Sequence, residues 1–281
     1  MIPAAFDYLR PQTLEEAVSL LVQHGDAAKL LAGGHSLIPA LKLRLAQPKT
    51  VIDIGRIADL SYIREQDDRI AVGAMTTHHA IETSALLKDR CPLLPEVAGL
   101  IGDVQVRNRG TLGGSLVHAD PAADWPAAIL ALDAEVEAVG PKGARVIPAR
   151  KFFTDLYQTA LLPDEILREI RFPVTAQSVA YVKTRQRASG FAIAGVAVVV
   201  NAADNTVRVG VTGVAAKAYR ATAVETKLAG QSLSAENIAA AAAKAANRIE
   251  PLGDIHASAG YRAHLARLDA RRALELAASR A

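Results

Sequence analysis

The sequence predicts an α+β protein, in which two small α/β lobes precede a C-terminal part where strands come before helices. Three observations support this fold class. Strand-like and helix-like segments alternate over the first half of the chain, and after Phe172-Pro173 three apolar strand-like runs precede Ala-rich helical segments. Hydrophobic residues make up 51% of the sequence and charged residues 22%, which supplies enough apolar surface for packed cores. A length of 281 residues suits roughly two domains.

The first lobe is expected to begin with a helix. Thr13 to Glu16 read as a capping box, in which Thr13 caps the helix and Glu16 reaches back to the amide of the cap residue. Gly25 favours a stop. Apolar residues follow the cap at the spacing of one helix face, namely Leu14, Ala17, Val18 and Leu21. Strands are predicted over residues 28–32 and 50–54, with a helix over residues 37–45 between them.

The second lobe repeats this alternation. The pattern predicts a strand over residues 69–73, helices over residues 77–88 and 124–132, and a hairpin of residues 135–139 and 145–147. The hairpin turn is Gly140-Pro141-Lys142-Gly143. His78 and His79 stand at a helix start, where we expect both side chains to be solvated.

The C-terminal part is expected to hold three strands and three helices. The strands are predicted over residues 179–183, 191–200 and 207–214, with a turn at Ala203-Asp204-Asn205 between the last two. The helices are predicted over residues 221–228, 235–249 and 258–278. We therefore divide the chain into a domain of residues 1–176, with lobes of about residues 1–57 and 58–176, and a domain of residues 177–281.

Composition excludes several classes of function. The net charge is only +3 and no basic run concentrates it, so a nucleic-acid partner is not expected. Cys91 is the single cysteine, so this chain cannot form an internal disulfide, a Cys-based zinc site or an iron–sulfur cluster, and we expect Cys91 to be a small, partly buried apolar residue. The start lacks the pattern of a signal peptide, and the longest apolar stretch, residues 191–200, has only strand length. These features predict no transmembrane segment and a cytoplasmic location.

Two glycine loops are the candidate binding elements. Ala32-Gly33-Gly34-His35-Ser36 lies between a predicted strand and a predicted helix, where glycines let a ligand approach the backbone and the amides of residues 34–36 favour phosphate. Gly110-Thr111-Leu112-Gly113-Gly114-Ser115 repeats this chemistry beside another helix. Neither loop is a Rossmann or P-loop motif. A pair of ligand-free tight turns and a pyrophosphate clamp both fit the residues alone.

Polar residues after the second loop leave two roles open. Asp124 precedes a predicted helix, so it could cap that helix or bind ribose hydroxyls of a nucleotide. His118 and Asp120 could form a metal pair, but no further ligand has suitable spacing, so no metal site is predicted. No catalytic triad or other catalytic residue is predicted, and any chemistry is expected to come from a bound cofactor.

At this point the two loops match a known family. Residues 31–37 and 111–115 resemble the paired FAD-binding signatures of the molybdenum hydroxylase (xanthine dehydrogenase) flavoproteins, and most closely those of the carbon monoxide dehydrogenase medium subunits. Phe6-Asp7-Tyr8, the segment of residues 73–78 and Gln105-Val106-Arg107-Asn108-Arg109-Gly110 resemble the same family. The segment of residues 118–124 is typical of the broad group and not of the carbon monoxide enzymes alone, so the substrate stays open.

The resemblance implies a fold and a cofactor. The fold would be a two-lobed FAD-binding domain of the vanillyl-alcohol-oxidase or PCMH type, followed by a C-terminal domain of a three-stranded antiparallel sheet and a three-helix bundle. FAD would bind non-covalently, with its pyrophosphate wrapped by the two loops, its ribose held by Asp124, its adenine near Ile101 and Leu167, and its flavin near Lys183 and Phe191. The loop residues implied are Ala32, Gly33, Gly34, His35, Ser36, Leu37, Thr111, Leu112, Gly113, Gly114 and Ser115.

The resemblance also implies partners. The chain would carry electrons from [2Fe-2S] clusters on a small subunit through FAD to an external acceptor, while a molybdopterin large subunit oxidises the substrate. A dimer of heterotrimers is expected. The sequence also allows two alternatives, a self-contained flavin oxidase or reductase of the same fold, and a non-catalytic nucleotide-binding assembly factor.

Overall fold

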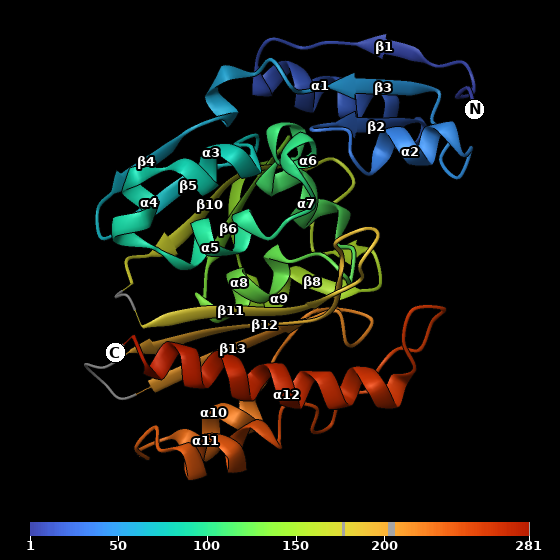
Figure 1. Cartoon of the computed structure of the whole chain (residues 1–281). Coiled ribbons are helices and arrows are strands. Elements are labelled where there is room, and N and C mark those ends of the chain that lie inside the picture. Colours follow the sequence, from blue (N-terminus) through green and yellow to red (C-terminus); the bar gives the residue numbers. More distant parts are fainter. Residues whose placement is uncertain (176–177, 202–205, 281) are drawn as a thin grey trace.

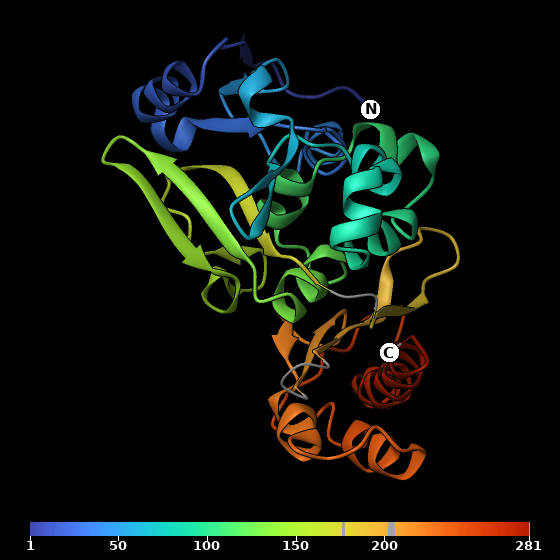
Figure 2. The same ribbon diagram turned by 90° about the vertical axis from the view of Figure 1, so that its left-hand side faces the viewer.

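Three sheets of three or more strands lie one after another along the molecule, and a two-stranded pair accompanies the middle one. The computed structural model describes residues 1–175, 178–201 and 206–280, so the expected boundary at residues 176/177 and the turn expected at Ala203-Asp204-Asn205 fall outside the described residues. The N-terminal lobe and the C-terminal helices stand at opposite ends, with the second lobe between them (Figures 1 and 2). Among the described residues, no helix is both long and apolar enough to cross a membrane.

The N-terminal lobe is a parallel three-stranded sheet with two helices. Thr13 caps the first helix as expected, its Oγ1 accepting from the amide of Glu16 at 3.2 Å, but the Glu16 carboxylate bonds the amide of Gln12 and not that of Thr13. The predicted apolar face of this helix is buried. The strand order is β1-β3-β2. The elements are β1 (Asp7–Leu9), α1 (Leu14–His24), β2 (Ala28–Leu31), α2 (Leu37–Lys42) and β3 (Thr50–Asp53).

Helix α2 ends three residues before its predicted end. Arg44 has a φ of 58°, and the amide of Leu45 bonds back to the carbonyl of Ala40. A left-handed residue followed by such a bond is a common way to end a helix. The apolar Leu43 and Leu45 therefore face solvent instead of extending the buried face.

The second lobe is a five-stranded antiparallel sheet in the order β4-β5-β10-β6-β7, with short helices on one face. The helix expected over residues 77–88 is two helices, because Ser84 is extended (ψ 117°) and its Oγ caps the second by accepting from Leu87. The strands are β4 (Ile63–Gln66), β5 (Arg69–Gly73), β6 (Glu135–Gly140), β7 (Gly143–Pro148) and β10 (Ile166–Pro173), with a small pair β8 (Phe153–Asp155) and β9 (Gln158–Thr159). The helices are α3 (His78–Thr83), α4 (Ala85–Arg90), α5 (Leu93–Gly99), α6 (Val104–Arg109), α7 (Leu112–His118), α8 (Trp125–Ala131) and α9 (Ala149–Phe152).

The C-terminal sheet has four antiparallel strands, and the expectation of three was wrong. The fourth, β14 (Tyr219–Arg220), pairs with Gly210 and Val211 and is too short to show an alternating pattern in the sequence. The helix expected over residues 235–249 ends at Ala242. The elements are β11 (Val179–Arg185), β12 (Ala192–Asn201), β13 (Thr206–Thr212), β14, α10 (Thr222–Leu228), α11 (Ala235–Ala242) and α12 (Ala259–Ala278).

This sheet is buried on both faces. Val179 and Tyr181 belong to the core shared with the second lobe, whereas Ala180 belongs to the core formed with the C-terminal helices. Helix α12 runs along one face of the sheet, and α8 packs against β13 and β12 on the other (Figure 1). Burial on both sides explains the unbroken apolar run of β12. Gly210 permits the close approach, since a Cβ there would lie 2.1 Å from the carbonyl oxygen of Ala127.

Candidate functional site

Residues 32–36, here called loop 1, connect β2 to α2. Gly34 has a φ of 81°, a left-handed conformation that favours glycine. Within the described residues, the backbone amides of Gly33, Gly34, His35 and Ser36 donate no hydrogen bond to the protein. His35 and Ser36 are exposed and the two glycines half-buried. Consecutive free amides around a left-handed glycine form a concavity suited to an anion.

Residues 110–115, here called loop 2, differ from loop 1, and the expectation that both loops offer the same chemistry was wrong. Thr111 caps α7, its Oγ1 accepting from the amide of Gly114 at 3.1 Å. The amides of Leu112 and Gly113 donate to the carbonyls of Thr76 and Ala74. These bonds tie loop 2 to the end of β5 and use the amides that the sequence pattern assigned to phosphate.

The two loops touch through glycines. A Cβ on Gly33 would lie 2.2 Å from the carbonyl oxygen of Arg109 and 2.9 Å from the Cα of Gly110. A Cβ on Gly114 would lie 3.3 Å from the Cβ of Ala32. Loop 1 with its free amides is therefore seated on loop 2, although the two are separated by more than seventy residues of sequence. The hydroxyls of Ser36 and Ser115 have no partner in the part of the chain that the structure describes.

The remaining loop residues have different surroundings. Leu37, the first residue of α2, is half-buried. Leu112 points into the core of the second lobe and is fully buried. Of the two, only Leu37 is partly open to a ligand.

Asp124, Lys183 and Tyr181 form a buried polar cluster where the second lobe meets the C-terminal sheet. The Asp124 carboxylate accepts from Tyr181 Oη at 2.6 Å and from Lys183 Nζ at 2.9 Å. The Asp124 and Lys183 side chains are 5% and 2% exposed. Burial raises the pKa of Asp124, while the Lys183 ammonium and the Tyr181 hydroxyl oppose that rise. Asp124 precedes α8 but makes no side-chain capping bond, so the capping interpretation was wrong.

Ile101 and Phe191 lie on two loops beside this cluster. Lys183 also donates to the carbonyl of Leu100, next to Ile101, at 3.0 Å. A Cβ on Gly190 would lie 3.6 Å from the Cα of Gly102, so the β11–β12 turn sits against the loop of residues 101–103. Ile101 is half-buried, whereas Phe191 is 47% exposed.

Helix α6 connects the two groups of predicted residues. Its six residues separate loop 2 from the loop that carries Ile101, a span of about 9 Å along a helix axis. Leu167 belongs to neither group. It lies on β10 in the core beneath α7 and is 3% exposed.

The expectation that the His78 side chain is solvated was wrong. His78 is 4% exposed, and its Nδ1 accepts a hydrogen bond from Trp125 Nε1 at 3.1 Å. His79, the next residue, keeps a side chain that is 48% exposed. No local pattern predicts this difference, because burial of His78 depends on Gly110 and Trp125, which are distant in sequence.

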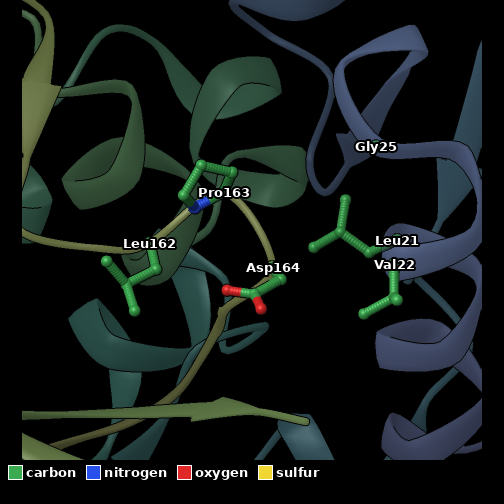
Figure 3. Close-up of a pocket in the computed structure, with 6 residues that line it drawn as sticks. All are labelled: Leu21, Val22, Gly25, Leu162, Pro163 and Asp164. Carbon is green, nitrogen blue, oxygen red and sulfur yellow. The ribbon is translucent and has the colours of Figure 1, made fainter.

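Neither of two surface cavities involves the predicted residues. One, of about 380 Å³, is lined by the end of α1 and the segment before β10, and Figure 3 shows Leu21 and Val22 facing Pro163 and Asp164 across it. The second, of about 260 Å³, is lined by residues of α8, α9 and β14 among others. Among the described residues, no group of three or more His, Cys, Asp or Glu side chains is placed to hold a metal ion.

The chain matches two family models. Residues 4–175 match the FAD binding domain in molybdopterin dehydrogenase, and residues 179–277 match the CO dehydrogenase flavoprotein C-terminal domain. The carbon monoxide dehydrogenase medium chain of Hydrogenophaga pseudoflava is 43% identical over 285 residues, covering 100% of this chain and 99% of that one. The 6-hydroxypseudooxynicotine dehydrogenase complex subunit alpha of Paenarthrobacter nicotinovorans is 38% identical, covering 100% of this chain and 97% of that one.

Solved structures agree with these matches. Carbon monoxide dehydrogenase from Hydrogenophaga pseudoflava superposes with a TM-score of 0.96 at 43% identity, covering 100% of this chain and 99% of that one. Quinoline 2-oxidoreductase from Pseudomonas putida 86 superposes with a TM-score of 0.93 at 31% identity, covering 99% of each chain.

Fold and sequence together define a flavoprotein subunit of an oxidoreductase complex. The chain belongs to the family of FAD-binding medium subunits of the molybdenum hydroxylases, which mediate electron transfer. Within that family it is similar over its full length to the medium chains of carbon monoxide dehydrogenases. The resemblance identified from the two loops is thereby confirmed.

Proposed function

We propose that loop 1 and loop 2 hold the pyrophosphate of a non-covalently bound FAD. The observation that supports this most directly is the run of free amides at residues 33–36, seated on loop 2. Loop 1 would supply the backbone donors and Ser36 and Ser115 their hydroxyls, while loop 2 supplies a rigid base. The residues present therefore fit the group, with loop 2 acting through shape more than through its amides.

We also propose positions for the rest of the cofactor. The exposed ring of Phe191 is available to a flavin, and Ile101 offers a half-buried apolar contact. Asp124 and Lys183 pair with each other, so their expected contacts with ribose and flavin would have to be made beside that ion pair. Leu167 is buried in the core, so its expected contact with adenine would require the residues that cover it to move aside. The domain division at residues 176/177 and the vanillyl-alcohol-oxidase type of fold belong to the same proposal.

Electrons would reach this chain from a partner. Bound FAD supplies a group that accepts single electrons and passes them on, and this chain has one cysteine, Cys91, which is buried. The proposed partners are a [2Fe-2S] small subunit and a molybdopterin large subunit, assembled as a dimer of heterotrimers in the cytoplasm. The relatives carry the names of enzymes for carbon monoxide, 6-hydroxypseudooxynicotine and quinoline, so the substrate of the large subunit is a separate question.

Native purification followed by reduction tests this proposal. The protein should carry FAD that trichloroacetic acid releases completely, because no covalent bond holds it. In the assembled complex, substrate of the large subunit should bleach the flavin absorbance, whereas this chain alone with the same substrate should stay oxidised. Bleaching by the chain alone would favour a self-contained oxidase, and a colourless chain that binds no FAD would favour the assembly-factor alternative.

A further inference from the structure

His78 lies directly behind loop 2. It is the first residue of α3, and its amide donates to the carbonyl of Gly110 at 2.9 Å. Its ring packs on the same glycine, since a Cβ on Gly110 would lie 2.7 Å from His78 Nε2. Gly110 is also the residue against which Gly33 of loop 1 rests. The His78 ring therefore borders the seam between the two loops.

The hydrogen bond from Trp125 determines which nitrogen of His78 carries the proton. The indole nitrogen is only a donor, so Nδ1 of His78 must accept, and the proton of the neutral ring resides on Nε2. Nε2–H has no acceptor among the described residues. It is not one of the fully buried polar atoms that lack a partner, so it keeps some contact with solvent. The His78 side chain is thus almost wholly buried, yet its Nε2–H stays open at the seam, where it is free to donate to a ligand bound between the loops.

The electrostatic surroundings favour an anionic acceptor. Burial, with smaller electrostatic contributions from His35 and Arg107, lowers the pKa of His78 to about 4. The ring is therefore a neutral donor at neutral pH. The positive charge of Arg107, which also pairs with Glu82, favours an anionic group at this seam over a cationic one.

We propose that His78 donates its Nε2–H to a phosphate oxygen of FAD and that Trp125 holds the ring in the tautomer that allows this. This inference rests on the proposed pyrophosphate site and adds a side-chain donor from α3 to it. Trp125 is a positioning residue in this arrangement, since it acts only through His78.

Two substitutions at residue 78 separate the two nitrogens. An Asn side chain can accept from Trp125 near the position of Nδ1 but has no donor near Nε2, whereas a Gln side chain places an amide donor near Nε2. We expect His78→Asn to weaken FAD binding to the apoprotein by about 10- to 100-fold, the range for a lost bond to a charged group. His78→Gln should keep most of the wild-type affinity. His79→Gln, at the exposed neighbour, should bind as wild type.

The readouts are the FAD dissociation constant from titration of the apoprotein, the same constant for ADP, and the melting temperature of each apoprotein. The Kd for ADP should rise with that for FAD in His78→Asn, because both ligands carry the phosphates. Wild-type affinity in His78→Asn, equal weakening in both variants, or an effect on FAD without an effect on ADP would each overturn the inference. Failure of the wild-type chain to bind FAD would instead reject the proposed function.

Nuclear magnetic resonance of ¹⁵N-histidine-labelled wild-type protein gives an answer that needs no variant. The spectrum should show one neutral histidine protonated at Nε2 whose Nε2 resonance moves when ADP is added. Protonation of that ring at Nδ1, or an Nε2 resonance indifferent to ADP, would contradict the proposal.

Discussion

Gly33 lies at a tight backbone contact between the two lobes. The hydrogen of its Cα faces the carbonyl of Arg109, which belongs to the backbone and cannot rotate away as a side chain would. Any larger residue must therefore push loop 1 off loop 2. The absence of a side chain at Gly33 is thus required for the contact between the lobes, whether or not a ligand is bound.

We expect Gly33→Ala to lower both stability and FAD affinity. Overpacking of a tight contact costs typically about 1–3 kcal/mol, and displacing loop 1 also disturbs its free amides. Urea unfolding of the apoprotein and FAD titration measure the two effects. Gly260→Ala is the control, because a Cβ at this helical position would make no packing contact within 4 Å with other segments among the described residues. Unchanged stability and affinity in Gly33→Ala would show that the lobes separate without cost.

Asp124 and Lys183 should stabilise the fold only as a pair. Removing one partner leaves a buried charge unpaired, which typically costs about 3–5 kcal/mol, whereas removing both leaves none. Asp124→Ala and Lys183→Met should each destabilise the apoprotein strongly, and the double variant should be less destabilised than the sum of the two. Urea unfolding of the four proteins gives the coupling. Simple additivity would mean that Tyr181 and solvent already satisfy Asp124.

At the scale of elements, one face of the five-stranded sheet of the second lobe carries a network of ion pairs between its strands. Glu169 on β10 has a side chain that is 1% exposed and accepts from Tyr62 and from Arg171, while Arg64 on β4 lies 3.3 Å from it. Burial raises the pKa of Glu169, but the bonds from Tyr62 and Arg171 outweigh burial and leave that pKa lowered. The folded state therefore holds this carboxylate charged.

Glu169→Gln should destabilise the protein by about 1.5–3 kcal/mol at neutral pH. Because the folded-state pKa of Glu169 is below its usual value, its contribution is complete above that usual value and disappears as the pH falls through the folded-state pKa. The unfolding free energies of wild type and variant should thus converge in acid. Glu65→Gln is the control, since Glu65 and its partner Arg90 are both exposed and such a pair contributes about 0–1 kcal/mol. A pH-independent difference would contradict the ionic origin.

Elements with local signals could be predicted from the sequence. The cap at Thr13 and the buried stripe of α1 need only neighbouring residues, and so does the apolar run of β12. The sequence could not predict the break at Ser84, where a side-chain cap competes with helix continuation. It also could not predict the two residues of β14, which exist only because β13 lies beside them.

In the candidate site, too, local features could be predicted from the sequence, whereas features that depend on distant residues could not. Glycines and their spacing identified both loops, but only the fold reveals that the amides of loop 2 are used internally. Asp124 was recognised as polar and well placed, yet its orientation depends on β11, a strand from another part of the chain. His78 was misjudged for the same reason, since its burial is decided by Trp125.

At the scale of the whole molecule, the central and C-terminal parts share one core. Val179, Tyr181, Ala197 and Val199 of the C-terminal sheet pack with the second lobe, and Thr212 Oγ1 donates to the carbonyl of Ala123 at 2.6 Å. Separating the second lobe from the C-terminal part would expose an entire face of the C-terminal sheet. The parts that the two family models match are thus packed together through a shared core.

The apoprotein should therefore unfold these two parts in a single transition. Differential scanning calorimetry should show one peak for them, with a calorimetric enthalpy equal to the van't Hoff enthalpy. A fragment of residues 178–281 should lack a native near-ultraviolet circular dichroism spectrum, because its exposed face has no partner. Two separated transitions, or a fragment with fixed tertiary packing, would disprove the shared core.

The contacts at Gly33 and Gly210 also restrict how this sequence can diverge. At both positions a methyl group would occupy space already filled by a backbone carbonyl, so no substitution of a neighbouring side chain can make room for it. Substitutions can change the exposed residues around Gly33 and Gly210, but they cannot replace these two glycines without breaking the backbone contacts. A lineage that retains them can therefore acquire new partner surfaces while the frame that presents loop 1 to loop 2 is inherited unchanged.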